Sequence, residues 1–173
     1  MKLPQQAINF YTTLGSLLAP LIFLGCALTS KEEESGKYST LRLYGSVNPD
    51  RTGRFQTVPI YRRSPIMITV KPKPFLDEGY IVEAAVVESN GGFSLRIQYD
   101  RRGTGLFENA THRLRNRHIA IHSSFSDSRW LAAPFIEKPI SDGVLIFTPD
   151  ATREEAERIV RGLNAIAEKL REG

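Results

Sequence analysis

Two stretches of alternating apolar and polar residues meet at the triplet Asn90-Gly91-Gly92, and this arrangement constrains the fold more than any other part of the chain. Asparagine and glycine tolerate the positive φ angles that tight turns require. After the triplet, apolar side chains occupy every second position: Phe93, Leu95, Ile97 and Tyr99. That alternation is typical of a strand with one buried face, and residues 81–88 supply its partner. The sequence therefore predicts a central antiparallel hairpin.

Shorter apolar segments on both sides of the hairpin predict further strands. They are rich in the β-branched and aromatic residues that favour sheets, and they are bounded by turn residues. These segments are residues 41–44, 55–61, 66–70, 118–122, 130–136 and 144–147.

Two segments have apolar residues at helical spacing. One predicts an amphipathic helix over residues 105–115, with Thr104 as its N-cap. The other begins after Thr152, which has capping-box spacing with Glu155, and its apolar stripe continues to Leu170. Gly162 lies inside this stripe and costs about 1 kcal/mol relative to alanine, which indicates a close approach of the helix to the sheet.

The order of these elements predicts a single-domain α+β fold, with a mainly antiparallel sheet and two amphipathic helices packed on it. A chain of 173 residues is long enough to bury a substantial core in one domain. The domain itself is expected to span residues 40–173.

The N-terminus has the parts of a secretory signal peptide. No charged residue occurs between Lys2 and Lys31, and residues 14–24 form a short apolar run before small residues. Phe23-Leu24-Gly25-Cys26 resembles the bacterial lipobox, in which the peptide is cleaved before a cysteine that carries lipid. The resemblance implies a signal peptide over 1–25, lipid on Cys26 and a domain that faces the periplasm. Residues 30–39 are polar and lack core-forming side chains, so we expect residues 26–39 to be a tether that carries the lipidated cysteine. Ala27 after the cysteine implies the outer membrane rather than the inner one.

Two alternatives to the lipoprotein interpretation stay open. Residues 3–30 are 28 uncharged residues, and a bilayer-spanning helix needs about 20, so an uncleaved membrane anchor is the first alternative. Pro20 and several polar side chains within the run count against a full span. The second alternative is a cytoplasmic protein with a chance apolar start. Since Cys26 is the only cysteine, the chain has no internal disulfide and no cysteine-cluster metal site.

A series of turn and core segments occurs in order between Val70 and about Leu163. The segments are Pro74-Phe75-Leu76, 81–85, Gly91-Gly92, Thr104, Phe107-Glu108, Thr111, 118–121, Ala132-Ala133-Pro134, 140–143, Phe147-Thr148 and Glu154-Glu155-Ala156. Together they resemble the head subdomain of the first periplasmic domain of SecD, a membrane subunit that assists protein export. The resemblance implies the same head fold and contact with emerging polypeptide. Residues 40–65 do not match clearly, and proton-driven pulling does not transfer without the membrane part.

The sequence lacks the strongest enzyme and metal motifs. No Gly-x-Ser-x-Gly, His-Glu-x-x-His or phosphate-binding loop occurs, so we expect a noncatalytic protein, with an unrecognised enzyme as the alternative. His118 and His122 share one face of a predicted strand but stand about 13 Å apart at the usual rise per residue. That separation is too large for both to bind one ion, and we expect neither a metal nor another cofactor.

Basic residues gather in two regions of the sequence. One group surrounds the predicted middle helix and the other precedes the hairpin: Arg101, Arg102, Arg113, Arg115, Arg117 and His118, then Arg54, Arg62, Arg63, Lys71 and Lys73. The net charge of +4 is too small to indicate nucleic-acid binding. We take Arg113, Arg115 and Arg117 as candidate binding residues for an acidic partner or an anionic surface, against the alternative of a solvated basic face. Trp130 is a candidate binding anchor if its side chain is exposed.

These features favour a periplasm-facing lipoprotein with a noncatalytic head module that binds peptide or protein and assists export. The partner would be an exported polypeptide or an envelope protein, and the lipid on Cys26 would attach the chain to the membrane. The alternative is a structural envelope protein whose basic face binds anionic wall or lipid surfaces. Neither the identity of the partner nor the oligomeric state follows from the sequence.

Overall fold

The structure, a computed structural model, describes residues 37–49, 54–89 and 91–172. The predicted signal peptide, Cys26 and nearly all of the predicted tether lie outside these residues. In chain order the described elements are β1 (Thr40–Gly45), β2 (Gln56–Ile60), β3 (Ile66–Val70), the 3-10 helix η1 (Glu78–Tyr80), β4 (Ile81–Ser89), β5 (Gly92–Tyr99), α2 (Arg101–Arg113), β6 (Arg117–Ser124), β7 (Ser128–Ala132), β8 (Phe135–Ile136), β9 (Val144–Phe147) and α3 (Arg153–Glu172).

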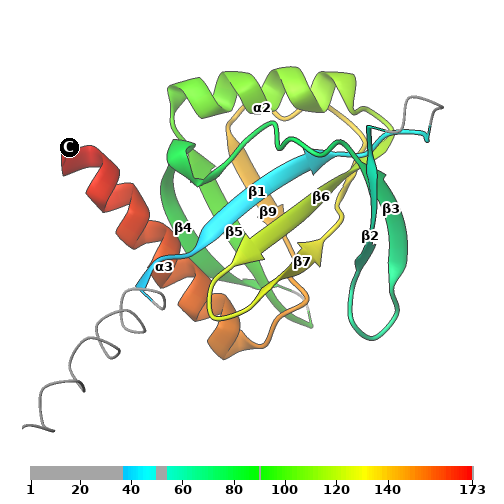
Figure 1. Cartoon of the computed structure of the whole chain (residues 1–173). Coiled ribbons are helices and arrows are strands. Elements are labelled where there is room, and N and C mark those ends of the chain that lie inside the picture. The colour runs from blue at the N-terminus through cyan, green and yellow to red at the C-terminus, as the bar shows by residue number, and fades with distance from the viewer. Residues whose placement is uncertain (1–36, 50–53, 90, 173) are drawn as a thin grey trace, which may run out of the picture.

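The strands form three antiparallel sheets. In sheet A the order is β1-β6-β7, with β8 also paired to β6; sheet B is the β2–β3 hairpin; and sheet C has the order β4-β5-β9. Figure 1 shows sheet A running diagonally across the front, the β2–β3 hairpin projecting at the right, α2 across the top and α3 at the lower left. The predicted α+β class is confirmed, with the strands divided among three sheets.

The main core lies between sheets A and C and is closed by the two helices. Sheet A contributes Leu43 and Ile121, and sheet C contributes Ile97, all with fully buried side chains. Phe107 of α2 and Ile159 of α3 belong to the same cluster. The period-2 pattern of the strands and the apolar stripes of the helices therefore meet in one core.

A second, smaller core joins the β2–β3 hairpin to the outer face of sheet A. Its buried members are Val58, Ile60, Ile68, Val70, Ala120 and Ala133. The tip of the hairpin is tied to the rest of the domain through Arg62, whose backbone N–H donates to Asp150 Oδ2 at 2.7 Å. The hairpin is thus docked on sheet A by apolar contacts, and its tip is bonded to the segment between β9 and α3.

The central hairpin and the helix cap of α3 agree with the sequence predictions. Strands β4 and β5 are paired through Ser89 and Gly92, and Gly91 has the positive φ, 86°, that a tight turn requires. At the start of α3, Thr152 N–H donates to Glu155 Oε2 at 2.8 Å and Glu155 N–H donates to Thr152 Oγ1 at 3.2 Å. These reciprocal bonds confirm the predicted capping box.

The start of α2 differs from the prediction. The helix begins at Arg101 rather than residue 105, because the Asp100 carboxylate accepts a hydrogen bond of 2.6 Å from Gly103 N–H and acts as the N-cap. Thr104 is therefore inside the helix and not its cap. Glycine is required at 103, since a Cβ there would lie 2.7 Å from the Cβ of Tyr80.

The prediction of one strand over residues 130–136 is also wrong in its extent. It is split into β7 and β8, and Ala133 and Pro134 lie between them. Proline lacks the N–H that a sheet ladder needs, so the ladder is interrupted there. After the break the chain pairs with β6 again at Arg117 and His118.

Candidate functional site

Two adjoining hollows form a basic groove beside the Gly45 end of β1. One hollow, of about 190 Å³, lies between the end of α2 and the segment after β3, and the other is about 350 Å³. They share Val47, Lys71 and Lys73. The term basic groove refers below to the surface of these two hollows, whose cationic lining residues are Arg54, Lys71, Lys73, Arg113 and Arg117.

The backbone brings these cations together from distant parts of the sequence. Lys71 N–H donates to Gly45 O at 3.2 Å, which places the end of β3 against the end of β1. The following Lys-Pro-Lys-Pro segment stays extended because proline restricts both itself and the residue before it. Lys71 and Lys73 therefore stand along one side of the groove.

The other side of the groove is made by the turn from α2 to β6. Arg113 lies in the last turn of α2, where a positive charge interacts favourably with the helix dipole. Asn116 has a φ of 59°, in the left-handed region that asparagine tolerates, and it reverses the chain direction. Arg117, the next residue, starts β6 and lines the groove with Arg113.

The floor of the groove is apolar. Phe75 and Leu114 line it and also pack against the main core. Gly45 lies beneath Leu114, and a Cβ at position 45 would come within 3.1 Å of Leu114 Cδ2. The groove thus combines a cationic rim with an apolar base, which suits a ligand that has both anionic and apolar groups.

Among the described residues, no acidic side chain lines the two hollows. Among the residues that the structure describes, the ion pairs involve other cations: Arg42, Arg62, Arg96, Arg129 and Arg153. The five cations of the basic groove make no ion pair with a described acidic side chain. A concave surface lined by one sign of charge concentrates the electrostatic potential.

The structure brings together some of the predicted binding residues and separates others. Arg113 and Arg117 lie in the groove, while Arg115 lies in the turn between them and does not line it. Lys71 and Lys73 come from the second basic group of the sequence. Arg62 from that second group bonds instead to Asp150, at the hairpin tip.

Trp130 lies apart from the groove, on β7. Its ring is half-buried and makes edge contacts with Tyr44 and His122, both with centroid separations of 5.0 Å. It lines a separate open hollow of about 320 Å³ together with Pro59 and Tyr61 of the β2–β3 hairpin. Trp130 is therefore a part of the smaller core with one accessible side, and its role as a binding anchor stays a prediction.

The two histidines of β6 have separate partners. His118 Nδ1 is 2.8 Å from Ala133 O, and its ring contacts Phe135. His122 Nε2 is 3.3 Å from Ser128 Oγ. Burial lowers the pKa of His122, with a further contribution from the nearby charge of Arg42. Within the described part of the chain, no three His, Cys, Asp or Glu side chains are grouped as a metal site.

Two other titratable groups have shifted pKa values, and neither lines the basic groove. Burial raises the pKa of Tyr99 far above its usual range. A hydrogen bond from Arg129 lowers the pKa of Glu155. Tyr99 is packed in the main core, and Glu155 is paired with Arg129. Packing and ion pairing therefore explain the two pKa shifts without a role in acid or base catalysis.

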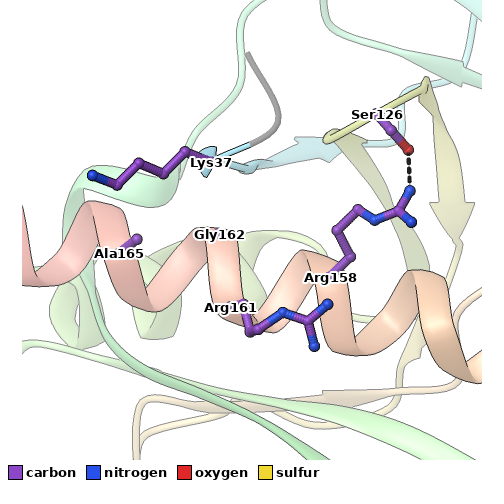
Figure 2. Close-up of a pocket in the computed structure, with 6 residues that line it drawn as sticks. All are labelled: Lys37, Ser126, Arg158, Arg161, Gly162 and Ala165. Carbon is purple, nitrogen blue, oxygen red and sulfur yellow. Dashed lines mark hydrogen bonds between the residues drawn. The ribbon is translucent and has the colours of Figure 1, made fainter. Parts of the chain in front are cut away.

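A second hollow with basic residues, of about 500 Å³, lies along α3 near the first described residue. Figure 2 shows Lys37, Arg158 and Arg161 around Gly162, with Arg158 bonded to Ser126 Oγ at 2.8 Å. The sequence reasoning did not select these residues. The exposed side of α3 also carries acidic residues, Glu154, Glu157 and Glu168, so its charge is mixed. The basic groove is the more strongly cationic of the two surfaces.

No helix within residues 37–49, 54–89 and 91–172 has the length and apolar content to cross a bilayer.

Similarity to known proteins is found at the level of the fold. No protein-family model matches the sequence, and no curated protein matches it either.

Two solved structures of SecDF are similar to this chain. One, from work on a membrane component SecDF that enhances protein export, aligns with 84% of this chain and 71% of that chain, with a TM-score of 0.56 and 18% identity. The other, SecDF in the super-membrane-facing form, aligns with 82% of this chain, with a TM-score of 0.57 and 18% identity, and only 21% of that chain is covered. This chain thus corresponds to about a fifth of the second protein. The described residues have the fold of a SecD-like domain, which confirms the resemblance found in the sequence.

Proposed function

We propose that this chain is a noncatalytic binding module of the bacterial envelope that contacts exported polypeptide and assists protein export. The observation that carries the proposal is the fold similarity, over 84% of the chain, to a membrane component described as enhancing protein export. The basic groove, with its apolar floor, supplies an accessible surface for a polypeptide segment.

The proposal includes an anchor through lipid on Cys26, in the outer membrane and facing the periplasm. The described chain starts beside α3, near the Thr40 end of β1 (Figure 1), and the lining residues place the groove at the Gly45 end. Five residue steps along a strand are about 17 Å. The groove is therefore separated, along the length of β1, from the point where the described chain begins.

The test of the export role is crosslinking in cells. A photoreactive amino acid is placed at Arg113, in the groove, and in a matched protein at Glu168, on the exposed side of α3. The expected result is that exported polypeptides or export subunits are recovered from position 113 and much less from position 168. If neither position captures any polypeptide, the export proposal is wrong.

The test of the anchor is the substitution Cys26→Ala with metabolic lipid labelling. Loss of the thiol removes the atom to which lipid would be attached. We expect the labelled band to disappear and an unprocessed precursor to accumulate. Normal processing of the variant would refute the lipoprotein interpretation and favour one of its two alternatives.

The groove also favours a second candidate function, a structural envelope protein whose basic surface binds anionic wall or lipid. The favouring observation is the cationic rim, which has no acidic lining residue in the described part of the chain. This function predicts that the protein sediments with cell-wall material or anionic vesicles at low salt and is released at high salt, because exposed charges are screened. Binding that is absent, or indifferent to salt, would remove this candidate.

A further inference from the structure

We infer that the basic groove binds an extended, acidic segment of polypeptide, whose carboxylates pair with the groove cations while its apolar side chains contact the floor. This inference rests on the proposed function and specifies the ligand of the same site. Its first basis is charge complementarity: among the residues that the structure describes, the rim has five cations and no acidic lining residue. Carboxylates form charge-assisted hydrogen bonds with lysine and arginine, and these are stronger than neutral ones.

The accessibility of the cations is the second basis. The side chains of Arg54, Lys71, Lys73, Arg113 and Arg117 all belong to exposed residues. No described acidic side chain neutralises them. A ligand therefore does not need to displace a described ion pair before it pairs with these cations. The positive potential also raises the association rate of an anionic ligand.

The form of the groove favours an extended chain over a single small anion. Lys71 and Lys73 border both hollows, so the two hollows adjoin along the Lys-Pro-Lys-Pro segment. Each hollow also has its own apolar contact, Leu114 in one and Phe55 in the other. An extended segment with alternating acidic and apolar residues places the two kinds of side chain on opposite faces, which fits the cationic rim and the apolar floor.

The headgroups of a membrane are the competing anionic ligand. The groove is a concave surface at the Gly45 end of β1. A segment of polypeptide can enter such a hollow, whereas the headgroups of a bilayer present a broad surface to it.

The experiment uses the full chain and three fluorescent peptides of equal length. Their repeats are Glu-Leu, Gln-Leu and Lys-Leu, so only the charge differs. Fluorescence anisotropy at low salt should give an affinity for the Glu-Leu peptide about tenfold higher than for the Gln-Leu peptide. The Lys-Leu peptide should bind least, because like charges face each other.

The variant that tests the site is Lys71→Glu with Arg113→Glu. Both residues are exposed, so the charge reversal leaves the buried core unchanged, and circular dichroism checks the fold. The matched control is Arg158→Glu with Arg161→Glu, which reverses two charges on α3. We expect the groove variant to lose at least about tenfold in affinity for the Glu-Leu peptide and the control to retain it. The milder Lys71→Gln with Arg113→Gln variant should give an intermediate loss.

The outcomes separate this inference from the proposed function. If the Gln-Leu peptide binds as tightly as the Glu-Leu peptide, or if the α3 variant weakens binding as much as the groove variant does, the inference is wrong and polypeptide binding stands. If no peptide and no unfolded protein binds, the proposed function itself fails. If the groove variant changes binding only to phosphatidylglycerol vesicles or to inorganic phosphate, the groove is an anionic-lipid or phosphate site, and the polypeptide assignment is overturned.

Discussion

At Gly162 the helix α3 meets the residue before β1. A Cβ at this position would lie 2.6 Å from the backbone nitrogen of Ser39. The sequence predicted a close approach of the helix to the sheet; the close neighbour is instead Ser39, the residue directly before β1. For Gly162→Ala, the helix-propensity gain of about 1 kcal/mol opposes an overpacking cost of about 1–3 kcal/mol. Because a backbone atom cannot rotate away, we expect a net fall in the free energy of unfolding, measured by urea denaturation.

Gly105→Ala is the matched control for that substitution. Gly105 lies inside α2, and apart from its two chain neighbours and the nearby backbone of the helix itself, no atom lies within 4 Å of the Cβ that alanine would add there. The propensity gain should therefore appear without a clash, as a rise in stability of up to about 1 kcal/mol. If Gly162→Ala also raises stability, the contact with Ser39 does not constrain the helix.

Tyr99 offers a test of a buried polar atom. Its hydroxyl has no hydrogen-bond partner among the described residues, and the residue is only 2% exposed. Burial raises its pKa, so the group stays protonated at any ordinary pH. Tyr99→Phe removes an unpaired hydroxyl and retains the ring contact with Phe107, so we expect a gain of about 1 kcal/mol in the free energy of unfolding. A loss of similar size would indicate that the hydroxyl has a partner, such as a bound water.

At the scale of elements, one side chain of α3 completes the edge of sheet C. Ala84 N–H donates to Asn164 Oδ1 at 2.8 Å, and Asn164 Nδ2 donates to Ala84 O at 2.9 Å. The amide replaces the neighbouring strand that β4 lacks on this side. Asn164→Ala should reduce the free energy of unfolding by about 1–3 kcal/mol and speed amide exchange at Ala84.

Asn109→Ala provides the comparison for Asn164. Asn109 also bonds a backbone carbonyl, Gly105 O at 2.8 Å, but it does so on the exposed side of α2. Since water replaces that bond easily, we expect Asn109→Ala to change the free energy of unfolding by less than about 0.5 kcal/mol. Equal effects of the two substitutions would mean that the edge of β4 does not depend on the amide.

The elements that the sequence predicted well are those fixed by local patterns. Alternation with a glycine turn defines the hairpin of β4 and β5, and the Thr152–Glu155 spacing defines the start of α3. The prediction missed Asp100 as a cap because the cap directly follows a strand, where the apolar pattern alone gives no boundary. It also extended β7 through Pro134, although proline at that point interrupts the ladder.

At the scale of the whole molecule, the basic groove depends on contacts that no local pattern reveals. Arg113 and Arg117 were predicted as binding residues from their own charge cluster. Their neighbours Lys71 and Lys73 reach them only because the end of β3 bonds to the end of β1. For Trp130, local sequence pointed to an exposed site and the tertiary structure covers most of it. Its side chain type and its place near a turn suggested a binding anchor, but the docked β2–β3 hairpin packs most of the side chain against the smaller core.

The docking of that hairpin is expected to depend on pH through Glu155. The Glu155 carboxylate is 2.7 Å from Arg129 Nη2 and 3.8 Å from Arg62 Nη2, so it joins α3, β7 and the hairpin tip. The hydrogen bond from Arg129 is the main cause that lowers the pKa of Glu155 below its ordinary value of 4.5. A lowered carboxyl pKa gives stability that is present above pH 4.5 and is lost as the pH falls through the folded-state value.

We therefore expect the wild-type protein to lose stability more steeply below pH 4.5 than the Glu155→Gln variant, which has no charge to lose there. The amides of β2 and β3 should show the earliest rise in hydrogen exchange, because Arg62 links the hairpin to this carboxylate. Urea denaturation from pH 7 to pH 3 measures the first effect. Parallel pH profiles for the two proteins would contradict it, and they would leave Asp150, which also bonds Arg62, as the residue that holds the hairpin tip.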